Sequence, residues 1–390
     1  MKILVLLPRF PYPLEKGDKL RAYNQVKYLA QRHTIHLCTL HDVNLEPSWI
    51  KALEPFCDSL HVIRLSKLRI ALNILRAFFT GLPLQVGYFY NKKAQKKIND
   101  IIREIQPDHI YCQLIRVAEY VKNLPVPKTL DYQDVFSKGV ERRAKTARWY
   151  MKPVLMSEYR RLCRYEKEVF DWFDNKTIIS VPDRDLIPHP KKEQIEIVIN
   201  GVDFEFFKPN RMNKEYELVF IGNMGYPPNI NAAEFLVKKI LPLVHEKKPE
   251  VRLTIAGATP HPNVLALAGE KVTVTGWVED IRECYAKSRI FIAPMQIGTG
   301  LQNKLLEAMA MKIPSITSEL ANSALKATPG KEILIGNSPE EYAIQILRIL
   351  DDNGLAETLS DGGYNFVHKN YDWASATGVL ENLIVKTPRK

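Results

Sequence analysis

The sequence predicts an α/β protein built from two doubly wound domains, and three observations support this prediction. Short apolar runs alternate with helical patterns through both halves of the chain, which is typical of parallel sheets covered by helices. The alternation pauses at a linker, 204–213, and restarts at Glu217. With 390 residues, 46% of them hydrophobic, the chain is long enough to bury two cores.

The predicted strands of the first domain are Ile3–Leu7, Ile35–Leu40, Leu60–Leu65, His109–Cys112, Thr129–Asp131, Thr177–Val181 and Ile195–Ile199, with helical patterns such as Asp18–Gln31 and Lys92–Ile105 between them. Those of the second domain are Leu218–Ile221, Arg252–Ala256, Val272–Thr275, Arg289–Ala293, Ser315–Thr317 and Ile333–Ile335. We therefore expect domains at 1–207 and 208–371, followed by a C-terminal helical segment at 372–390.

The composition limits the partners and the compartment. The 55 basic and 44 acidic residues give a net charge of +11, which favours nucleotides, nucleic acid or acidic lipid surfaces. No nucleic-acid-binding motif is visible, so we expect no nucleic-acid partner.

Five scattered cysteines without a Cys-x-x-Cys pair indicate a reducing compartment. The first apolar run is too short for a signal peptide, and no run reaches the ~20 residues of a membrane span, so we expect a cytoplasmic protein.

The stretch 298–317 carries the clearest functional pattern. A buried strand, Ile290–Pro294, leads to a turn that contains Gly298 and Gly300 and then to a helix. The helix start offers free N–H groups and the positive end of its dipole, and Lys304 lies in its first turn, with Glu307 about one turn later. Such a pocket suits a nucleotide, with phosphates on the amides and lysine and ribose on the carboxylate. An ordinary α/β crossover with a surface lysine and glutamate would give the same pattern.

The first domain has a similar turn after its first strand. A proline-rich loop, 8–18, ends in Gly17 at a predicted helix start, although it lacks the Gly-x-Gly-x-x-Gly dinucleotide pattern. Asp131-Tyr-Gln-Asp134 closes a strand at the same sheet edge and supplies acidic candidates, with a helix-cap or turn role as the alternative.

Two further helical segments carry strong charge. Residues 66–79 are amphipathic, and Lys67, Arg69 and Arg76 make the segment basic. The segment either lies on an anionic membrane surface or packs its apolar side on the core. The pattern at 141–173 is rich in arginine, and we expect Pro153 to kink or divide it.

Four motifs in order resemble those of GT-B glycosyltransferases, most closely the retaining family-4 group and its exopolysaccharide and surface-polysaccharide enzymes. They are Asn200-Gly-Val-Asp203, the segment 220–231, Thr275-Gly-Trp-Val-Glu-Asp280 and Leu306-Glu-Ala-Met-Ala310. The resemblance implies two Rossmann-like domains facing a central cleft, with the nucleotide-sugar held mainly by the second. It also implies that the final helix crosses back to pack on the first domain.

The resemblance assigns donor-site roles to particular residues. Glu307 would contact the ribose, and the backbone amides of Leu301–Lys304 would hold the pyrophosphate. The other donor-site residues it implies are Gly17, Gly222, Asn223, Trp277, Val278, Thr299, Gly300, Leu301, Gln302, Asn303 and Lys304. Thr299 stands where the family has a glutamate that reads sugar hydroxyls, and the family's basic pair is absent near Asn223. Lys304 is the residue that would supply the missing charge.

The resulting prediction is a glycosyltransferase of hexosyl or N-acetylhexosaminyl type. It would move a sugar with retention from a UDP- or GDP-sugar to a lipid-linked or polysaccharide acceptor at the inner face of the cytoplasmic membrane. Without an Asp-x-Asp motif in a metal-binding context, we predict no metal and no cofactor besides the donor. Asp18, Arg116 and Asp134 are the catalytic candidates. The alternatives are a GT-B nucleotide-sugar epimerase and a non-catalytic GT-B partner protein in polysaccharide assembly.

Overall fold

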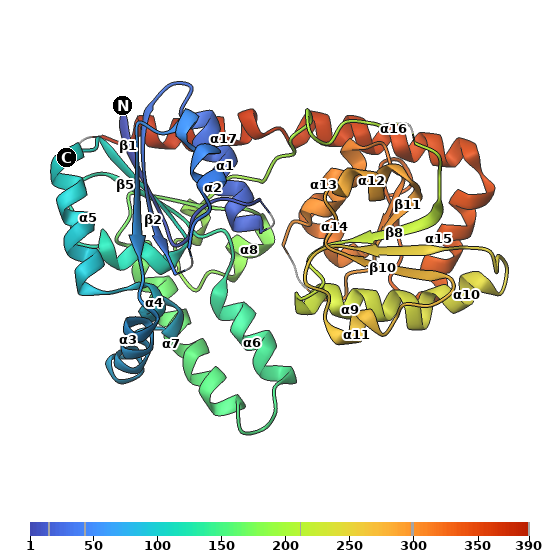
Figure 1. The fold of residues 1–390 in the computed structure, drawn as a ribbon, viewed down its shortest axis with the longest axis horizontal. Coiled ribbons are helices and arrows are strands. Elements are labelled where there is room, and N and C mark those ends of the chain that lie inside the picture. The colour runs from blue at the N-terminus through green and yellow to red at the C-terminus, as the bar shows by residue number, and fades with distance from the viewer. Residues whose placement is uncertain (15, 43, 211, 298–299, 389–390) are drawn as a thin grey trace. The chain divides into compact units, whose positions relative to one another are not determined.

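The computed structural model of the protein describes every residue except 15, 43, 211, 298–299 and 389–390 (Figure 1). The chain forms two compact units. Unit 1 comprises Met1–Ile199 and the C-terminal segment from Trp373, and unit 2 comprises Asn200–Asp372. Both are α/β, as the sequence predicts.

Unit 1 contains a seven-stranded parallel sheet in the order β3-β2-β1-β4-β5-β6-β7. Its strands are β1 (Lys2–Leu7), β2 (Thr34–His41), β3 (Ser59–Arg64), β4 (His109–Gln113), β5 (Lys128–Asp131), β6 (Asn175–Ile178) and β7 (Glu196–Ile197). Along β1, Leu4 and Leu6 lie in the core on one face of the sheet, whereas Ile3 and Val5 lie in the core on the other. Burial on both faces explains why Ile3–Leu7 of this strand is wholly apolar, whereas Lys2 at its start is exposed.

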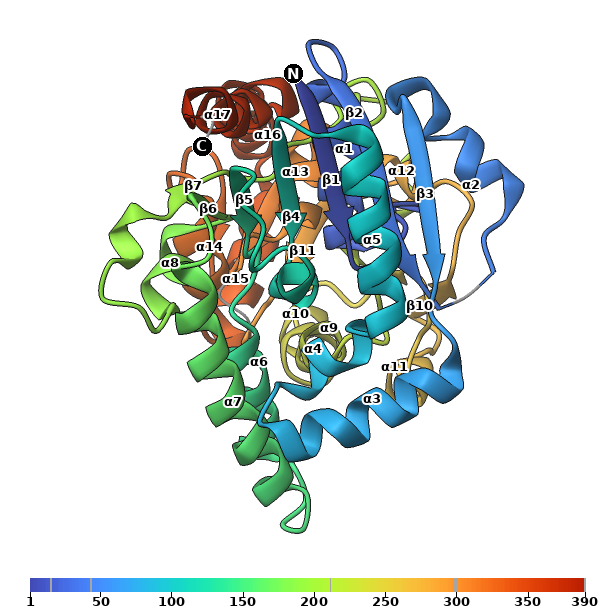
Figure 2. The ribbon, with the colours of Figure 1, turned by 90° about the vertical axis from the view of Figure 1, so that its left-hand side faces the viewer.

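Helices cover both faces of this sheet (Figure 2). They are α1 (Gly17–Leu29), α2 (Pro47–Lys51), α3 (Lys67–Thr80), α4 (Leu84–Phe89), α5 (Lys92–Ile105), α6 (Phe136–Thr146), α7 (Lys152–Phe170), α8 (Val181–Leu186) and α17 (Trp373–Lys386), with short 3₁₀ turns η1 (Glu54–Phe56), η2 (Ile115–Tyr120) and η3 (Lys192–Gln194). Pro153 divides the 141–173 pattern, because it occupies the first turn of α7, where its missing N–H costs no helical hydrogen bond.

The C-terminal helix α17 packs within unit 1. Leu380 and Ile384 share a core with β1 and α1. Asn175 at the start of β6 donates to the carbonyl of Leu383 at 3.1 Å, and Glu381 accepts from His33 at 2.9 Å. The apolar face and these polar contacts join the end of the chain to its first domain.

Unit 2 contains a six-stranded parallel sheet in the order β10-β9-β8-β11-β12-β13. Its strands are β8 (Tyr216–Ile221), β9 (Leu253–Ala256), β10 (Val272–Gly276), β11 (Ser288–Ala293), β12 (Ser315–Thr317) and β13 (Leu334–Ile335). Its helices are α9 (Pro227–Phe235), the π-turn η4 (Leu236–Ile240), α10 (Leu241–His245), α11 (Pro262–Leu265), α12 (Ile281–Ala286), α13 (Asn303–Ala310), α14 (Glu319–Leu325), α15 (Pro339–Asp351) and α16 (Asn353–Asn370). The first strand in sequence, β8, is central, so the turn after it lies at the switch point where open sheets bind ligands.

Among the described residues, no helix has the length and apolar character needed to cross a membrane.

Candidate functional site

The turn after β8 is held in close backbone contact with the turn after β9. Gly257 has a φ of +136°, and a Cβ at this position would lie 1.9 Å from the carbonyl oxygen of Gly222. Only glycine fits such a conformation and approach. A Cβ on Gly222 would in turn lie 2.8 Å from Nδ2 of Asn229 and 3.4 Å from Nζ of Lys304. The two glycines therefore let the β8 turn approach side chains that come from α9 and α13.

Asn229 links this turn to α13. Its side chain is almost completely buried in the first turn of α9. Nδ2 donates to the carbonyl of Asn223 at 2.9 Å, and Oδ1 accepts from the ammonium of Lys304 at 2.5 Å. One amide thus fixes both the backbone of the turn and the position of the lysine.

The ammonium group of Lys304 lies beside Phe220 and Gly222, at the carboxyl end of β8. Burial lowers the pKa of its ammonium to about 7, while the charge of Glu307 acts in the opposite direction. The ammonium also lies 5.1 Å from the centre of the Phe220 ring. An anion at the β8 turn would favour the charged form of this lysine.

The start of α13 adds backbone donors beside Lys304. No described residue caps this end with a side chain, and Gln302 instead donates from Nε2 to the carbonyl of Gly300 at 2.9 Å. Asn303 accepts at Oδ1 from Asn200 at 3.1 Å, so the Asn200–Asp203 motif meets the stretch 298–317 here. The helix start can direct its uncapped N–H groups and its dipole toward an anion.

Glu307 lies one turn beyond Lys304 on α13. Tyr285 donates to its Oε2 at 2.8 Å, and burial raises the pKa of the carboxyl group. Tyr285 also donates to the carbonyl of Lys304 at 3.2 Å. The tyrosine therefore orients the carboxylate, and Oε1 can accept a ligand hydroxyl.

Other predicted donor residues follow β10 or precede α13. Trp277 follows β10 and is 63% exposed, and Val278 beside it is half-buried. Leu301 is half-buried just before α13. Gly298 and Thr299 lie outside the described residues, so the expected change at the sugar-reading position stays a prediction.

Sequence reasoning missed two residues of the site. Asn229 lies 75 positions before Lys304, and Tyr285 lies 22 positions before Glu307. Neither has a spacing that marks it as a partner. The segment 220–231 includes Asn229, but its residues gave no reason to pair this amide with the lysine.

In unit 1, the predicted catalytic residues lie at the carboxyl edge of the sheet. Asp18, next to Gly17 in the first turn of α1, forms a salt bridge with Nε of Arg9 at 3.3 Å. Arg116 in η2 donates to Gln85 at 2.9 Å, and its guanidinium lies 4.4 Å from the centre of the Phe136 ring. Burial and the charge of Arg9 lower the pKa of Arg116 to about 10, whereas the carboxylates of Asp18 and Asp134 act to raise it.

The two aspartates of the 131–134 segment differ in environment. Asp131 is completely buried and accepts from Nε of Arg21 at 2.6 Å, from Tyr111 at 3.0 Å and from Thr177 at 2.9 Å. Its contacts join α1, β4, β5 and β6, so its role is structural. Asp134 is exposed, and its Oδ1 accepts from the N–H of Val135 at 2.7 Å.

Solved structures with the same architecture match almost the whole chain. A sucrose-phosphate synthase from Thermosynechococcus elongatus superposes with a TM-score of 0.72 over 99% of both chains, at 14% identity. HepE of Anabaena in complex with UDP superposes with a TM-score of 0.70 over 99% of this chain and all of its own, at 13% identity. The fold is GT-B. A UDP-N-acetylglucosamine 2-epimerase described as putative, from Listeria monocytogenes, has a lower TM-score of 0.58.

Sequence comparisons agree with the GT-B assignment. Residues 215–352, which lie within unit 2, match the family model of glycosyl transferases group 1. An uncharacterized 44.6 kDa protein in the cps region of Klebsiella pneumoniae is 22% identical over 95% of this chain and 96% of its own length. The matched region contains the whole Lys304, Asn229, Tyr285 and Glu307 network.

No group of three or more histidines, cysteines, aspartates or glutamates in the described part of the chain is arranged to hold a metal ion. Metal independence stays a prediction, which a chelation experiment can test.

Proposed function

We propose that this chain is a retaining family-4 glycosyltransferase that moves a hexosyl or N-acetylhexosaminyl group from a UDP-sugar to a polysaccharide or lipid-linked acceptor. The observation that carries the proposal is the link of Lys304 through Asn229 to the β8 turn, with Glu307 one turn along the same helix. A cation, uncapped backbone N–H groups and a carboxylate on one helix are the groups that a nucleoside diphosphate would need, which supports the proposal.

Each group has a defined part in donor binding. Lys304 and the first N–H groups of α13 would hold the diphosphate, and Glu307 would accept from a ribose hydroxyl. Trp277 and Val278 would lie beside the base. As the bond to the anomeric carbon breaks, negative charge develops on the departing diphosphate, and preorganised donors stabilise that charge without requiring a metal.

The choice of donor rests on a structural relative. HepE is described in complex with UDP-glucose as well as UDP, and that complex superposes on this chain with a TM-score of 0.69. A UDP-sugar is therefore our first choice of donor, and a GDP-sugar is the comparison to test.

The acceptor proposal combines two observations. The relative in the Klebsiella cps region supports polysaccharide synthesis. On the acceptor side, Asp18, Arg116 and Asp134 would position the acceptor hydroxyl at the carboxyl edge of the unit 1 sheet. The basic helix α3 belongs to the same unit and would contact the inner face of the cytoplasmic membrane, where a lipid-linked acceptor is found.

The decisive experiment measures nucleotide binding first and turnover second. Titration calorimetry with UDP and GDP should give saturable binding of UDP that is weakened by Glu307→Ala. UDP-sugars should then be hydrolysed slowly alone and consumed faster with saccharide or lipid-linked acceptors, and the product's anomeric configuration should match that of the donor.

Three other results would redirect the proposal. Conversion of a UDP-sugar to its epimer without an acceptor would identify an epimerase. Nucleotide binding without any turnover, or no binding at all, would favour a non-catalytic GT-B partner protein. Asp134→Asn should reduce transfer while leaving UDP affinity unchanged, and unchanged transfer would remove Asp134 from the acceptor site.

A further inference from the structure

Helix α3 leaves most of its apolar side uncovered. Ile70 and Ala77 pack into the unit 1 core, yet four large apolar residues at helical spacing remain between 57% and 78% exposed: Leu68, Leu72, Leu75 and Phe79. Phe78 is also exposed. A row of large apolar side chains with this exposure indicates a surface that a partner or a bilayer covers.

A second apolar group lies at the loop between α6 and α7. Trp149 is 82% exposed, and Tyr150, Met151 and Val154 beside it are exposed as well. Within unit 1, this loop and α3 both extend from the end to which the strands point, as both ribbon views show (Figures 1 and 2). The carboxyl edge of the sheet therefore bears two apolar projections.

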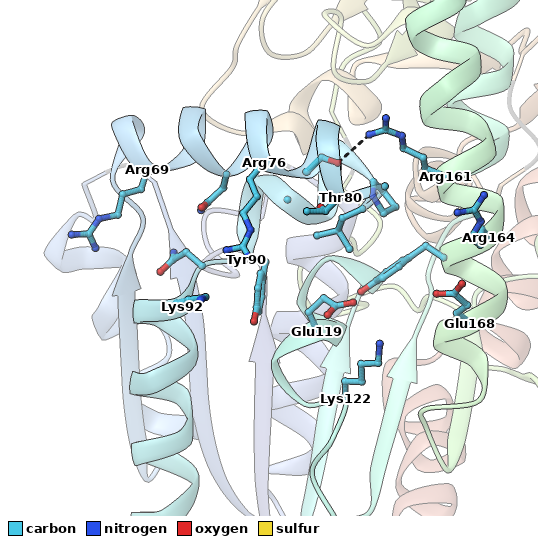
Figure 3. Close-up of a pocket in the computed structure, with 18 of the residues that line it drawn as sticks. Arg69, Arg76, Thr80, Tyr90, Lys92, Glu119, Lys122, Arg161, Arg164 and Glu168 are labelled. Atoms are coloured by element: carbon cyan, nitrogen blue, oxygen red, sulfur yellow. Dashed lines mark hydrogen bonds between the residues drawn. The ribbon is translucent and has the colours of Figure 1, made fainter.

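A basic pocket lies between α3 and α7. Its volume is about 620 Å³, within the range of small-molecule sites. Two acidic residues, Glu119 and Glu168, line it together with seven basic ones: Arg69, Arg76, Lys92, Lys93, Lys122, Arg161 and Arg164. Figure 3 shows Arg76 extending from α3 toward Tyr90. Arg164, which belongs to α7, and Lys122 line other walls of the same pocket.

One of these arginines builds the pocket, whereas others are available to a ligand. Arg161 donates to the carbonyls of Ala77 and Phe78 at 3.1 and 2.9 Å, which ties α7 to the last turn of α3 (Figure 3). Arg76 and Arg164 are exposed, and neither forms a salt bridge with any residue that the structure describes. The pocket thus combines a fixed wall with guanidinium groups that no described residue holds in a salt bridge, and its basic residues outnumber its two glutamates.

We propose that this pocket binds the phosphate headgroup of an anionic membrane lipid while the exposed side chains of α3 and of the α6–α7 loop insert into the bilayer. Arginine pairs favourably with phosphate through two parallel hydrogen bonds, so Arg76 and Arg164 suit this ligand. A soluble phosphate would account for the charge but not for the apolar residues around it. An uncharged protein partner would account for the apolar residues but not for the charge.

Membrane binding at this pocket would give the proposed transferase its orientation. The headgroup site and the predicted acceptor residues belong to the same edge of unit 1, so docking would bring a lipid-linked acceptor to that edge. The inference deepens the proposed function through its acceptor side. Its test uses binding alone and does not depend on turnover.

The test is flotation of the full-length protein with vesicles of phosphatidylcholine, alone or mixed with phosphatidylglycerol. We expect binding to the mixed vesicles only. Arg76→Gln/Arg164→Gln should weaken this binding at least tenfold more than Lys96→Gln/Lys97→Gln, a matched loss of two exposed charges on α5 outside the pocket. Equal losses would show general attraction to the surface and would overturn the headgroup site.

A second pair of measurements separates a lipid from a soluble anion. Leu72→Ser/Phe79→Ser should abolish flotation without changing UDP affinity, because these side chains would enter the bilayer. Two results together would identify a soluble-anion site instead. The Leu72→Ser/Phe79→Ser variant would float as well as the wild type. The protein would also bind inorganic pyrophosphate tightly, and Arg76→Gln/Arg164→Gln would abolish that binding. UDP binding that stays intact in every variant would show that any failure concerns this pocket and not the donor site.

Discussion

The ammonium of Lys304 lies 2.5 Å from Oδ1 of Asn229, whose Nδ2 donates to the backbone carbonyl of Asn223 at 2.9 Å. Burial makes the charged form of this lysine unfavourable in the free protein, and its pKa falls to about 7. An anionic ligand at the β8 turn would add negative charge to that of Glu307 and would favour the charged lysine. If the proposed function holds, binding of a diphosphate would therefore be coupled to protonation of Lys304.

Lys304→Met should weaken UDP binding by roughly ten- to a hundredfold, because a hydrogen bond to a charged group contributes about 1.5–3 kcal/mol. The unfolding temperature should stay the same or rise, since the substitution removes a buried charge and keeps the aliphatic length. Calorimetry and thermal unfolding measure the two effects. Lys247→Met, an exposed lysine of the same unit, is the control and should change neither.

The affinity for a UDP-sugar should depend on pH through Lys304. Below about pH 7 the ammonium is already charged, so affinity should be flat with respect to this group. Above that pH the free site loses its proton and binding must restore it, so affinity should fall by up to about tenfold per pH unit. Titrations over this range should show the slope in the wild type and none in Lys304→Met. A slope of the same size in both proteins would assign it to another group.

Glu307→Gln should lower UDP affinity about tenfold with little effect on folding, because the neutral amide is a weaker acceptor for a ribose hydroxyl. Tyr285→Phe removes the donor to Glu307 and should produce a smaller loss by leaving the carboxylate less well oriented. Binding of uracil alone is the discriminating measurement and should be the same in all three proteins. Weaker binding of the base would mean that Glu307 acts on the shape of the pocket.

Gly257→Ala should destabilise unit 2 by about 3 kcal/mol or more, because the new methyl group would overlap the carbonyl of Gly222 and φ is +136°. Gly269→Ala is the matched control, since a Cβ there meets nothing within 4 Å. Urea unfolding followed by tryptophan fluorescence compares them. Equal stability of the two variants would show that the β8 and β9 turns can separate without cost.

Asp131→Asn should destabilise unit 1 by about 3–5 kcal/mol, because it leaves the buried guanidinium of Arg21 without its charged partner. Asp100→Asn breaks the exposed pair with Arg103 and should have little effect, since solvent screens such pairs. Thermal unfolding of the two variants gives the comparison. UDP affinity should survive in Asp131→Asn at temperatures where it remains folded, because the residue belongs to unit 1.

Several expectations followed from local patterns and are present in the structure. The strand and helix alternation predicted two parallel sheets, because buried strands are largely apolar and covering helices are amphipathic. The position of Pro153 predicted a break in the long arginine-rich pattern, and α7 begins there. The apolar spacing of 66–79 predicted a helix, but the pattern left open whether its apolar side faced the core or the solvent.

Local sequence patterns predict the fold class, the helix that carries Lys304 and Glu307, and the basic amphipathic segment, because each depends on residues within a few turns or one strand. Tertiary structure decided which distant groups meet. It alone placed Asn229 against Lys304, Tyr285 against Glu307, and Arg76 in one pocket with Arg164. The physical reason is that helical and strand periodicity fix the direction of a side chain relative to its own element, whereas strand order and packing determine its neighbours.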